Sequence, residues 1–256
     1  MLTGIDHFIV AVPSPDDAAR ELEAALGLRA GAGGRHEEYG SFNRLIWLGD
    51  SYIELLGVAD PALAGRAWFG PKALEVLGDP GGGYVGMSFA SDDLESDVAA
   101  LRAGGSRLRA PEAGERARPD GRAVRWKVAT LPEADAQLGH LFLIEHDSAS
   151  AEWTAQERAA RATEEHPLGG AARLERVELP VRDMKSASMH AHRDVGLQFR
   201  PSLVGAGARD SSVGRQTLRL VPGGPGIMPV VVVHGGGEAR ELRALGCLWR
   251  LEPAEE

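Results

Sequence analysis

The sequence has almost no cysteine and no long apolar run. Its single cysteine, Cys247, excludes an internal disulfide framework and any metal site made of cysteines alone. No stretch approaches the ~18 apolar residues that a membrane-spanning helix needs, and the N-terminus lacks a basic segment followed by an apolar one. We therefore expect a soluble, cytoplasmic protein with no membrane partner.

Positive charge is also in deficit. The chain carries 28 lysines and arginines against 37 aspartates and glutamates, which gives a formal net charge of -9 at pH 7. Nucleic-acid-binding domains usually carry a basic surface, so this balance predicts no nucleic-acid partner. The 256 residues are enough for one large domain or two small ones with a substantial core.

The first stretch with a clear pattern is a strand over residues 4–13, with a histidine, His7, in its middle. A helix signal follows directly. Ser14 is a typical N-cap, Pro15 suits the first turn, and Gly27 is a typical helix stop. The pattern predicts a strand followed by a helix of about three turns.

Two further strands are predicted over residues 44–48 and 51–57, because a two-residue turn signal, Gly49-Asp50, separates two apolar segments. Glu54 lies in the middle of the second of them. An unpaired carboxylate inside an apolar strand costs several kcal/mol or becomes neutral, so Glu54 requires a partner.

The same order of elements returns after a connecting segment rich in proline and glycine. We expect a strand over 84–91, a helix over 92–103, a strand over 106–110, a charged loop over 112–122, and strands over 123–130 and 140–146. Residues 114–122 of the loop form either a mobile lid or a solvated hairpin. Glu145 falls in the last strand, as Glu54 does in its own. Laid over the first unit, the second has Gly86 where the first has His7.

A third, weaker copy of the pattern begins at residue 174. It has apolar strands over 216–221 and 228–234, a predicted helix over 238–245 and a final strand over 247–251. Because this unit has no partner in the chain, either it packs on the first two or it pairs with its copy in a second subunit. The second possibility predicts a homodimer.

Three units of strand, helix and three strands, with a histidine on the first strand and glutamates on last strands, resemble the vicinal oxygen chelate superfamily. That superfamily includes glyoxalase I, extradiol dioxygenases, methylmalonyl-CoA epimerase and the fosfomycin- and bleomycin-resistance proteins. The chain looks most like the glyoxalase-like domain family, over residues 3–180. The residues that carry the resemblance are Ile5-Asp6-His7, Gly34-Arg35-His36, Asn43, Leu48-Gly49-Asp50-Ser51-Tyr52-Ile53-Glu54-Leu55, Arg118-Pro119-Asp120-Gly121, Arg125-Trp126, Phe142-Leu143-Ile144-Glu145 and His166-Pro167.

The resemblance implies an α+β fold in which paired βαβββ modules form a cupped mixed sheet. We expect a glyoxalase-like domain over residues 1–147, with modules at 3–58 and 84–147, and a third, degenerate βαβββ-like module over 171–253. In metal-using members, inward residues on the first and last strands of each module hold a divalent cation. The corresponding residues here are His7, Glu54, Gly86 and Glu145, and Gly86 departs from the pattern because it has no side chain.

The resemblance thus predicts a metal site made of His7, Glu54 and Glu145, suited to Zn, Mn, Fe or Ni. The metal would polarise a carbonyl, and Glu54 or Glu145 would act as the catalytic base for a neighbouring proton. His36 would supply a further ligand if its loop folds over the cup. The structural alternative for His7 is a core histidine whose hydrogen bonds are satisfied.

Substrate contacts are predicted for Arg35, His36 and Asn43, near the mouth of the first module, and for Arg125 and Trp126. The last two alternate along one strand, so both cannot face the cup. Three functions remain open for a small-molecule ligand. They are a metal-assisted lyase or isomerase, a metal-free binding or resistance protein that uses the same cavity, and a non-haem iron dioxygenase, which usually needs two histidines and one glutamate.

Overall fold

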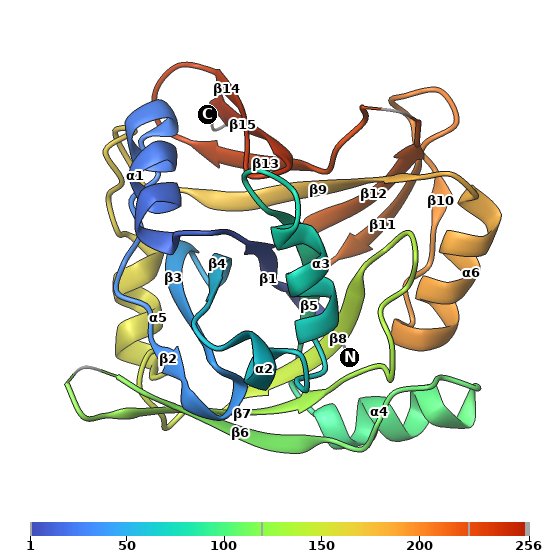
Figure 1. Ribbon diagram of the computed structural model, residues 1–256. Coiled ribbons are helices and arrows are strands. Elements are labelled where there is room, and N and C mark those ends of the chain that lie inside the picture. The colour runs from blue at the N-terminus through green and yellow to red at the C-terminus, as the bar shows by residue number, and fades with distance from the viewer. Residues whose placement is uncertain (1, 119, 225, 254–256) are drawn as a thin grey trace.

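The structure is a computed structural model that describes residues 2–118, 120–224 and 226–253. Its strands form two mixed sheets, one above the other in Figure 1. The first sheet contains β1 (Leu2–Ala11), β2 (Arg35–His36), β3 (Ser41–Leu48), β4 (Ser51–Val58), β5 (Gly83–Ser91), β6 (Glu112–Ala117), β7 (Ala123–Ala129) and β8 (His140–His146). The helices that accompany it are α1 (Pro15–Leu26), the 3-10 helix η1 (Glu37–Tyr39), α2 (Pro61–Ala64), α3 (Gly70–Leu77), α4 (Leu94–Ala103) and α5 (Ala155–Ala162).

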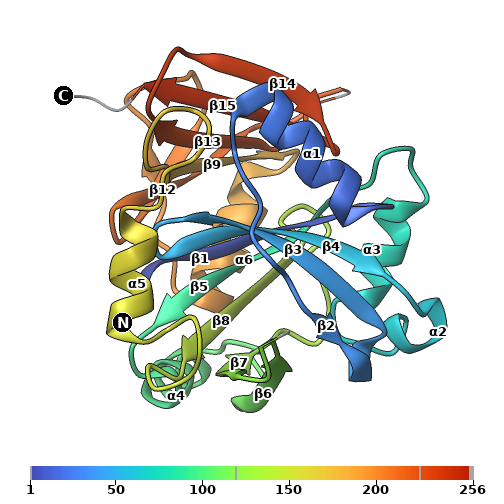
Figure 2. The same cartoon turned by 90° about the vertical axis from the view of Figure 1, so that its left-hand side faces the viewer.

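The first sheet has the strand order β2-β3-β4-β1-β5-β8-β7-β6. Strand β1 runs parallel to β4 and antiparallel to β5, and β5 runs parallel to β8. Two βαβββ modules therefore meet along β1 and β5. The two edge strands, β2 and β6, approach each other, so the sheet curls into a cup (Figure 2). This arrangement confirms the predicted fold.

Local sequence signals determine where α1 begins and ends. The Ser14 side chain accepts a hydrogen bond from the Asp17 backbone N–H at 3.3 Å, which satisfies one of the free donors of the first turn. Gly27 ends the helix with φ 73°, a left-handed conformation that favours glycine. Leu22 and Leu26, four residues apart on one face of the helix, are buried in the core.

The second sheet repeats the strand order of the first on a smaller scale, as β10-β11-β12-β9-β13-β15-β14. It is made by β9 (Arg173–Val181), β10 (Arg200–Pro201), β11 (Arg209–Val213), β12 (Gln216–Pro222), β13 (Val230–Gly235), β14 (Arg240–Ala244) and β15 (Cys247–Pro253), with helix α6 (Met184–Val195). The helix expected over residues 238–245 is wrong. That segment forms β14, which pairs antiparallel with β15.

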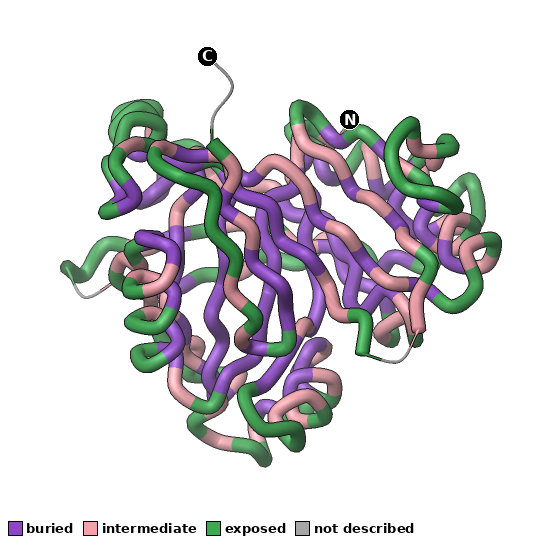
Figure 3. The backbone as a smooth tube through the Cα atoms, turned by 90° about the horizontal axis from the view of Figure 1, so that it is seen from above, coloured by how far each residue is buried: buried purple, intermediate pink, exposed green. Residues whose placement is uncertain are grey.

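A continuous core lies between the two sheets. The convex face of the cup contributes residues such as Phe8 and Leu55, and the facing side of the second sheet contributes Val177 and Trp249, all fully or almost fully buried. Helices α1, α4 and α6 add apolar faces to the same cluster. Figure 3 shows the buried strands of both sheets surrounded by exposed helices and turns. The third module therefore packs on the first two, one of the two arrangements left open by the sequence.

One side chain of the second sheet completes the hydrogen bonding of the first. Gln216 accepts the backbone N–H of Ile5 through Oε1 at 2.6 Å, and its Nε2 donates to Ser51 Oγ at 2.6 Å. The bond occurs beside the irregular pairing of β1, where the register with β5 shifts on both sides of Ile5. A residue from β12 thus holds the first strand of the cup.

Two sequence-based assignments in the second module also differ from the structure. No described strand covers residues 106–110, and the charged segment 112–122 is not a loop. Its first part is β6, which pairs antiparallel with β7 to form a hairpin. Within the described ranges, no helix has both the length and the apolar character needed to cross a membrane.

We predict that Gln216→Ala lowers the free energy of unfolding by about 2 kcal/mol, because it leaves the Ile5 N–H in a partly buried place without an acceptor. Urea denaturation followed by circular dichroism measures this. The exposed Gln198 provides the control, since Gln198→Ala should change stability by less than about 0.5 kcal/mol. Equal effects of the two substitutions would contradict the role given to Gln216.

Candidate functional site

A cavity lies in the cup of the first sheet. It contains about 800 Å³ of space that no atom fills, part of which opens to solvent. Strands β1, β3, β4, β7 and β8 form its floor and sides, and Trp68 and Phe69, between α2 and α3, cover one end. Residues after β8, among them Glu152 and Trp153, cover another part. The curved sheet alone would leave an open groove, and these segments convert it into a pocket.

A β-bulge places two neighbouring side chains of β1 in this pocket region. Ile5 pairs with Phe89 and His7 pairs with Ser88, so Asp6 is one residue too many for the ladder. The regular alternation of faces is broken at this point. Asp6 and His7 consequently contact each other on the same side, with His7 Nδ1 2.6 Å from Asp6 Oδ1.

Asp6 also contacts a second imidazole, from the end of β8. His146 Nε2 lies 3.0 Å from the other carboxylate oxygen, Oδ2. Burial raises the pKa of the Asp6 carboxyl, but the charge and hydrogen bonds of His146 and His7 outweigh burial and hold that pKa well below its usual range. The carboxylate is therefore an acceptor for both rings. This leaves His7 Nε2 and His146 Nδ1 for other partners.

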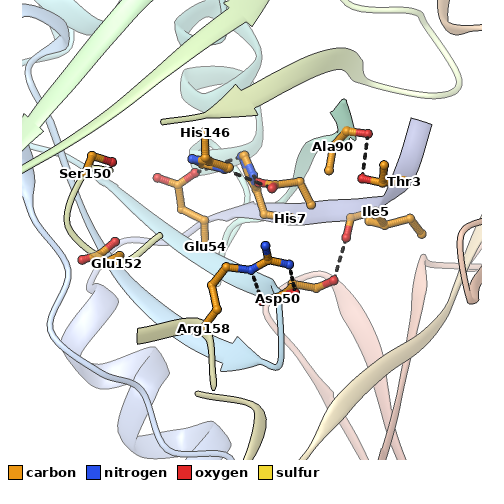
Figure 4. Close-up of polar contacts among 12 residues, drawn as sticks. Thr3, Ile5, His7, Asp50, Glu54, Ala90, His146, Ser150, Glu152 and Arg158 are labelled. Atoms are coloured by element: carbon orange, nitrogen blue, oxygen red, sulfur yellow. Dashed lines mark hydrogen bonds and ion pairs between the residues drawn. The ribbon is translucent and has the colours of Figure 1, made fainter. Parts of the chain in front are cut away.

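His7 Nε2 is directed at Glu54 of the neighbouring strand β4. Its distance to Glu54 Oε2 is 3.8 Å, and Figure 4 shows His7, Glu54 and His146 converging from three strands. The other oxygen, Glu54 Oε1, accepts a hydrogen bond of 2.6 Å from Asn43 Nδ2. Asn43 Oδ1 in turn accepts the Gly34 N–H at 2.8 Å, so Asn43 is fixed at both ends.

Aromatic rings make up most of the remaining wall. Tyr52 stacks on His7 with the ring centroids 4.5 Å apart, and Phe142 meets His7 edge-on at 5.4 Å. Four of the five tryptophans of the chain line the pocket, namely Trp47, Trp68, Trp126 and Trp153. Such rings offer a large apolar contact area at a small cost in conformational entropy. The wall suits a ligand with an apolar or aromatic body.

Burial favours the neutral form of two further titratable groups of the pocket, His36 and Tyr52. It lowers the pKa of His36, an effect that the Glu54 charge partly opposes. It raises the pKa of Tyr52 well above its usual value, and the negative charges of Asp6 and Glu54 act in the same direction. At neutral pH both side chains are uncharged hydrogen-bonding groups.

The predicted site residues divide into two groups. His7, His36, Asn43, Glu54 and Trp126 all line the pocket. The placement of His36 agrees with the expectation that its segment folds over the cup, where its Nδ1 lies 3.3 Å from Ser41 Oγ.

The other predicted residues lie outside the pocket. Arg35 is exposed and pairs with Glu37. Arg125 is exposed and pairs with Glu115, as expected once Trp126 faces inward. Glu145 accepts the backbone N–H of Leu94 at 2.8 Å, where the positive end of helix α4 favours an acid. The expectation that Glu145 faces His7 and Glu54 therefore differs from the structure, because the strand alternation directs His146 inward instead.

Several pocket residues were not predicted from the sequence. His146 is next to the predicted Glu145. The prediction assigned the wrong face of β8 to the pocket and therefore missed His146. Arg116 was assigned to a loop, but it lies on β6 with 5% of its surface exposed, and its Nη2 donates to Glu152 Oε2 at 2.8 Å. Tyr52 and Trp153 carry no motif. The alternation of β4, counted from Glu54, would have indicated Tyr52.

The sequence model of the Glyoxalase-like domain family matches residues 5–195 of this chain. The chain belongs to this family. The match confirms the resemblance to glyoxalase-like proteins and spans both modules of the cup, α6 and the start of the second sheet. A comparison with curated proteins gave no match.

Solved structures resemble this one to different degrees. A hypothetical protein from Staphylococcus aureus is 16% identical, with 99% of this chain and 100% of that chain covered, and superimposes with a TM-score of 0.80. Methylmalonyl-CoA epimerase from Streptomyces coelicolor matches with 19% identity over 59% of this chain and 99% of its own, at a TM-score of 0.43. Methylmalonyl-CoA epimerase from Mycobacterium tuberculosis is 22% identical over 56% of this chain and 88% of its own, at a TM-score of 0.40. The first comparison shows the fold over the whole chain.

The strand register tests whether this glyoxalase-like pocket has the donors for a metal. Glu54 lies opposite Ile9, two residues after His7, and Phe142 lies opposite Ser88, two residues after Gly86. His7 pairs with Ser88 and Ile9 pairs with Gly86, as a two-fold relation between the modules requires. The positions equivalent to His7 and Glu54 are therefore Gly86 and Phe142.

Neither of these positions can donate to a metal. Gly86 has no side chain, and a Cβ built there would lie 2.3 Å from the carbonyl oxygen of His140, so the close packing of β5 and β8 requires glycine. Phe142 is a hydrocarbon. Among the described residues, no group of three or more histidines, cysteines, aspartates or glutamates could hold a metal ion. The pocket therefore has two of the four expected ligand positions filled by donors, His7 and Glu54. The third residue of the predicted metal site, Glu145, lies outside the pocket.

We predict weak binding of divalent metals, because two donors fall short of the three or four protein ligands of typical sites. Elemental analysis of protein purified without a metal-affinity tag should find far less than one Zn, Mn, Fe or Ni per chain. Treatment with EDTA should leave the melting temperature unchanged. Stoichiometric metal that disappears in His7→Ala would contradict this prediction.

A second prediction concerns His140, which packs edge-on against Trp68 at a centroid distance of 5.1 Å. Burial, with a smaller contribution from Lys72, lowers the pKa of His140 from 6.5 to about 4. Between these values the unfolded chain binds the proton more tightly than the folded protein. Stability from this group is thus complete above the unfolded pKa and falls as the pH decreases toward 4.

For His140 this linkage amounts to about 2 kcal/mol between about pH 7 and pH 5. We predict that His140→Phe reduces the loss of stability over this interval by about that amount, as measured by urea denaturation at both pH values. The exposed His192 is the control, and His192→Phe should leave the pH dependence unchanged. The same pH dependence in the wild type and His140→Phe would show that His140 is protonated as readily in the folded state as in the unfolded state.

Proposed function

We propose that this glyoxalase-like protein catalyses metal-independent proton transfer on a small carbonyl compound, which makes it an isomerase or epimerase in reaction type. The observation that carries the proposal is the pair formed by His7 and Glu54. Their facing atoms are 3.8 Å apart inside the pocket, and a buried carboxylate, Asp6, supports the imidazole from behind. Two titratable groups side by side in a largely apolar pocket are a typical arrangement for acid–base catalysis.

Each residue has a defined part in this mechanism. The carbonyl oxygen of the substrate accepts a hydrogen bond from His7 Nε2–H, and Glu54 Oε2 removes the proton from the adjacent carbon. The electron pair of the broken C–H bond forms the enol double bond as the oxygen takes the proton of His7. Glu54 then returns a proton to the same carbon while the enol oxygen gives its proton back to His7 Nε2, which re-forms the C=O bond and regenerates both residues. Delivery to the opposite face of the enol, after the enol turns in the pocket, inverts that carbon and gives the epimer.

The surroundings keep these two groups in position. Asp6 accepts His7 Nδ1–H, which fixes the ring orientation and places a negative charge beside the ring. Asn43 holds Glu54 Oε1 and leaves Oε2 for the substrate. Trp68 and Tyr52 restrict water, which strengthens each of these electrostatic interactions.

We predict that the protein catalyses exchange of the α protons of phenylpyruvate or acetophenone for solvent deuterium in the presence of EDTA. Proton NMR measures the rate. Glu54→Gln should lower the rate by about 100-fold or more, because the amide cannot take a proton. Glu145→Gln is the matched control, since it alters a glutamate of the equivalent module that lies outside the pocket, and its rate should equal that of the wild type.

Two results would contradict the proposal. One is an exchange rate that requires added metal, and the other is equal exchange by the wild type and Glu54→Gln. A protein that binds the compounds but never exchanges their protons would instead support a second function, metal-free sequestration of a small molecule.

The second function has its own observation in its favour. At the positions equivalent to His7 and Glu54, the second module carries Gly86 and Phe142, which have no reactive group. Aromatic rings dominate the pocket walls. Ligand binding without turnover would quench the fluorescence of the four lining tryptophans. A metal-assisted lyase and an iron dioxygenase are not proposed, since the register supplies one histidine and one glutamate at the equivalent positions. The cytoplasmic location and the homodimer stay predictions.

A further inference from the structure

Arg116 has a buried donor that the protein itself does not satisfy. The residue lies on β6, lines the pocket and has 5% of its surface exposed. Its Nη2 donates to Glu152 Oε2 at 2.8 Å, whereas its Nη1 is buried and has no hydrogen-bond partner among the described residues. A buried donor on a charged group is costly to leave without an acceptor. The position of Nη1 therefore indicates an acceptor that is not part of the chain.

The surroundings hold Arg116 firmly in this position. Glu152, its partner, has φ 69°, a left-handed conformation that costs a glutamate about 1 kcal/mol or more. Arg118 also contacts Glu152, at 3.4 Å through Oε1, so two guanidinium groups share one carboxylate. On the other side, Gly34 leaves the space that Arg116 occupies, because a Cβ there would lie 2.6 Å from Nη1.

A short chain of contacts connects Arg116 with the proposed acid–base pair. Gly34, which lies against Arg116 Nη1, donates its backbone N–H to Asn43 at 2.8 Å. Asn43 donates to Glu54 at 2.6 Å, and Glu54 faces His7. A ligand held by Arg116 thus occupies the same pocket as the two groups that would act on it.

We propose that Arg116 Nη1 binds a carboxylate of the ligand, so that the substrate class is small carboxylic acids with an aromatic or apolar body. A guanidinium with a free, rigidly placed N–H group matches a carboxylate oxygen in charge and geometry. The body of the ligand contacts the aromatic wall, where Trp126 meets His36 edge-on at a centroid distance of 6.4 Å. This proposal rests on the proposed function for the reaction, but the binding step stands on Arg116 alone.

The test compares phenylacetate with phenylacetamide, which differ only in the charge and donor pattern of one group. Binding is measured by quenching of tryptophan fluorescence and by calorimetry, with both compounds taken to millimolar concentration. The wild type should bind the acid at least about tenfold more tightly than the amide. In Arg116→Gln this preference should fall to about one, while Arg125→Gln, which changes an exposed arginine outside the pocket, should keep it.

Arg116→Lys provides a second variant in case Arg116→Gln does not fold. The single amino group of lysine is expected to pair with Glu152, so the preference for the acid should be lost although the charge remains. The proposal would be overturned if the amide bound as tightly as the acid, if the acid failed to bind at millimolar concentration, or if either Arg116 variant kept the wild-type preference.

The result separates this proposal from the proton-transfer mechanism. Phenylacetate binding that depends on Arg116, without deuterium exchange on carbonyl compounds, would leave the carboxylate site intact and contradict the mechanism. Deuterium exchange that depends on Glu54, without any preference for phenylacetate over phenylacetamide, would support the mechanism and contradict the carboxylate site.

Discussion

The site depends on one buried carboxylate. Asp6 is almost completely inaccessible to solvent, and an isolated anion in such a place would be unstable. Two imidazoles compensate for its burial, one from its neighbour His7 and one from His146 at the end of the other module. The interaction therefore joins the two halves of the cup and orients both rings. It requires the bulge of β1, since a regular strand would direct Asp6 and His7 to opposite faces.

The cup is symmetric in its backbone and asymmetric in its chemistry. The same strand register relates the two modules, but one carries His7 and Glu54 and the other carries Gly86 and Phe142 at the equivalent positions. The backbone hydrogen bonds that define the fold do not depend on these side chains. The same backbone arrangement can therefore carry different side-chain chemistry in its two halves.

Local patterns predicted much of the fold and part of the site. The sequence predicted the N-cap at Ser14, the helix end at Gly27 and the acid inside an apolar strand at Glu54. Each of these features depends on only a few neighbouring residues. The sequence did not predict which face of β8 lines the pocket. Neighbouring residues of a strand point to opposite faces, so an error of one residue exchanges Glu145 and His146. Arg116 was missed for a different reason. Its burial depends on Glu152, a partner 36 positions away in a segment without regular structure.

The bond between Ile5 and Gln216 spans 211 positions, almost the full length of the chain. During synthesis the first strand of the cup leaves the ribosome long before the side chain that completes its hydrogen bonding. Until the second sheet is made, the convex face around Phe8 and Leu55 also lacks the cover that Val177 and Trp249 later provide. The nascent protein thus passes through a stage with an exposed apolar surface, which is the type of surface that chaperones protect from aggregation.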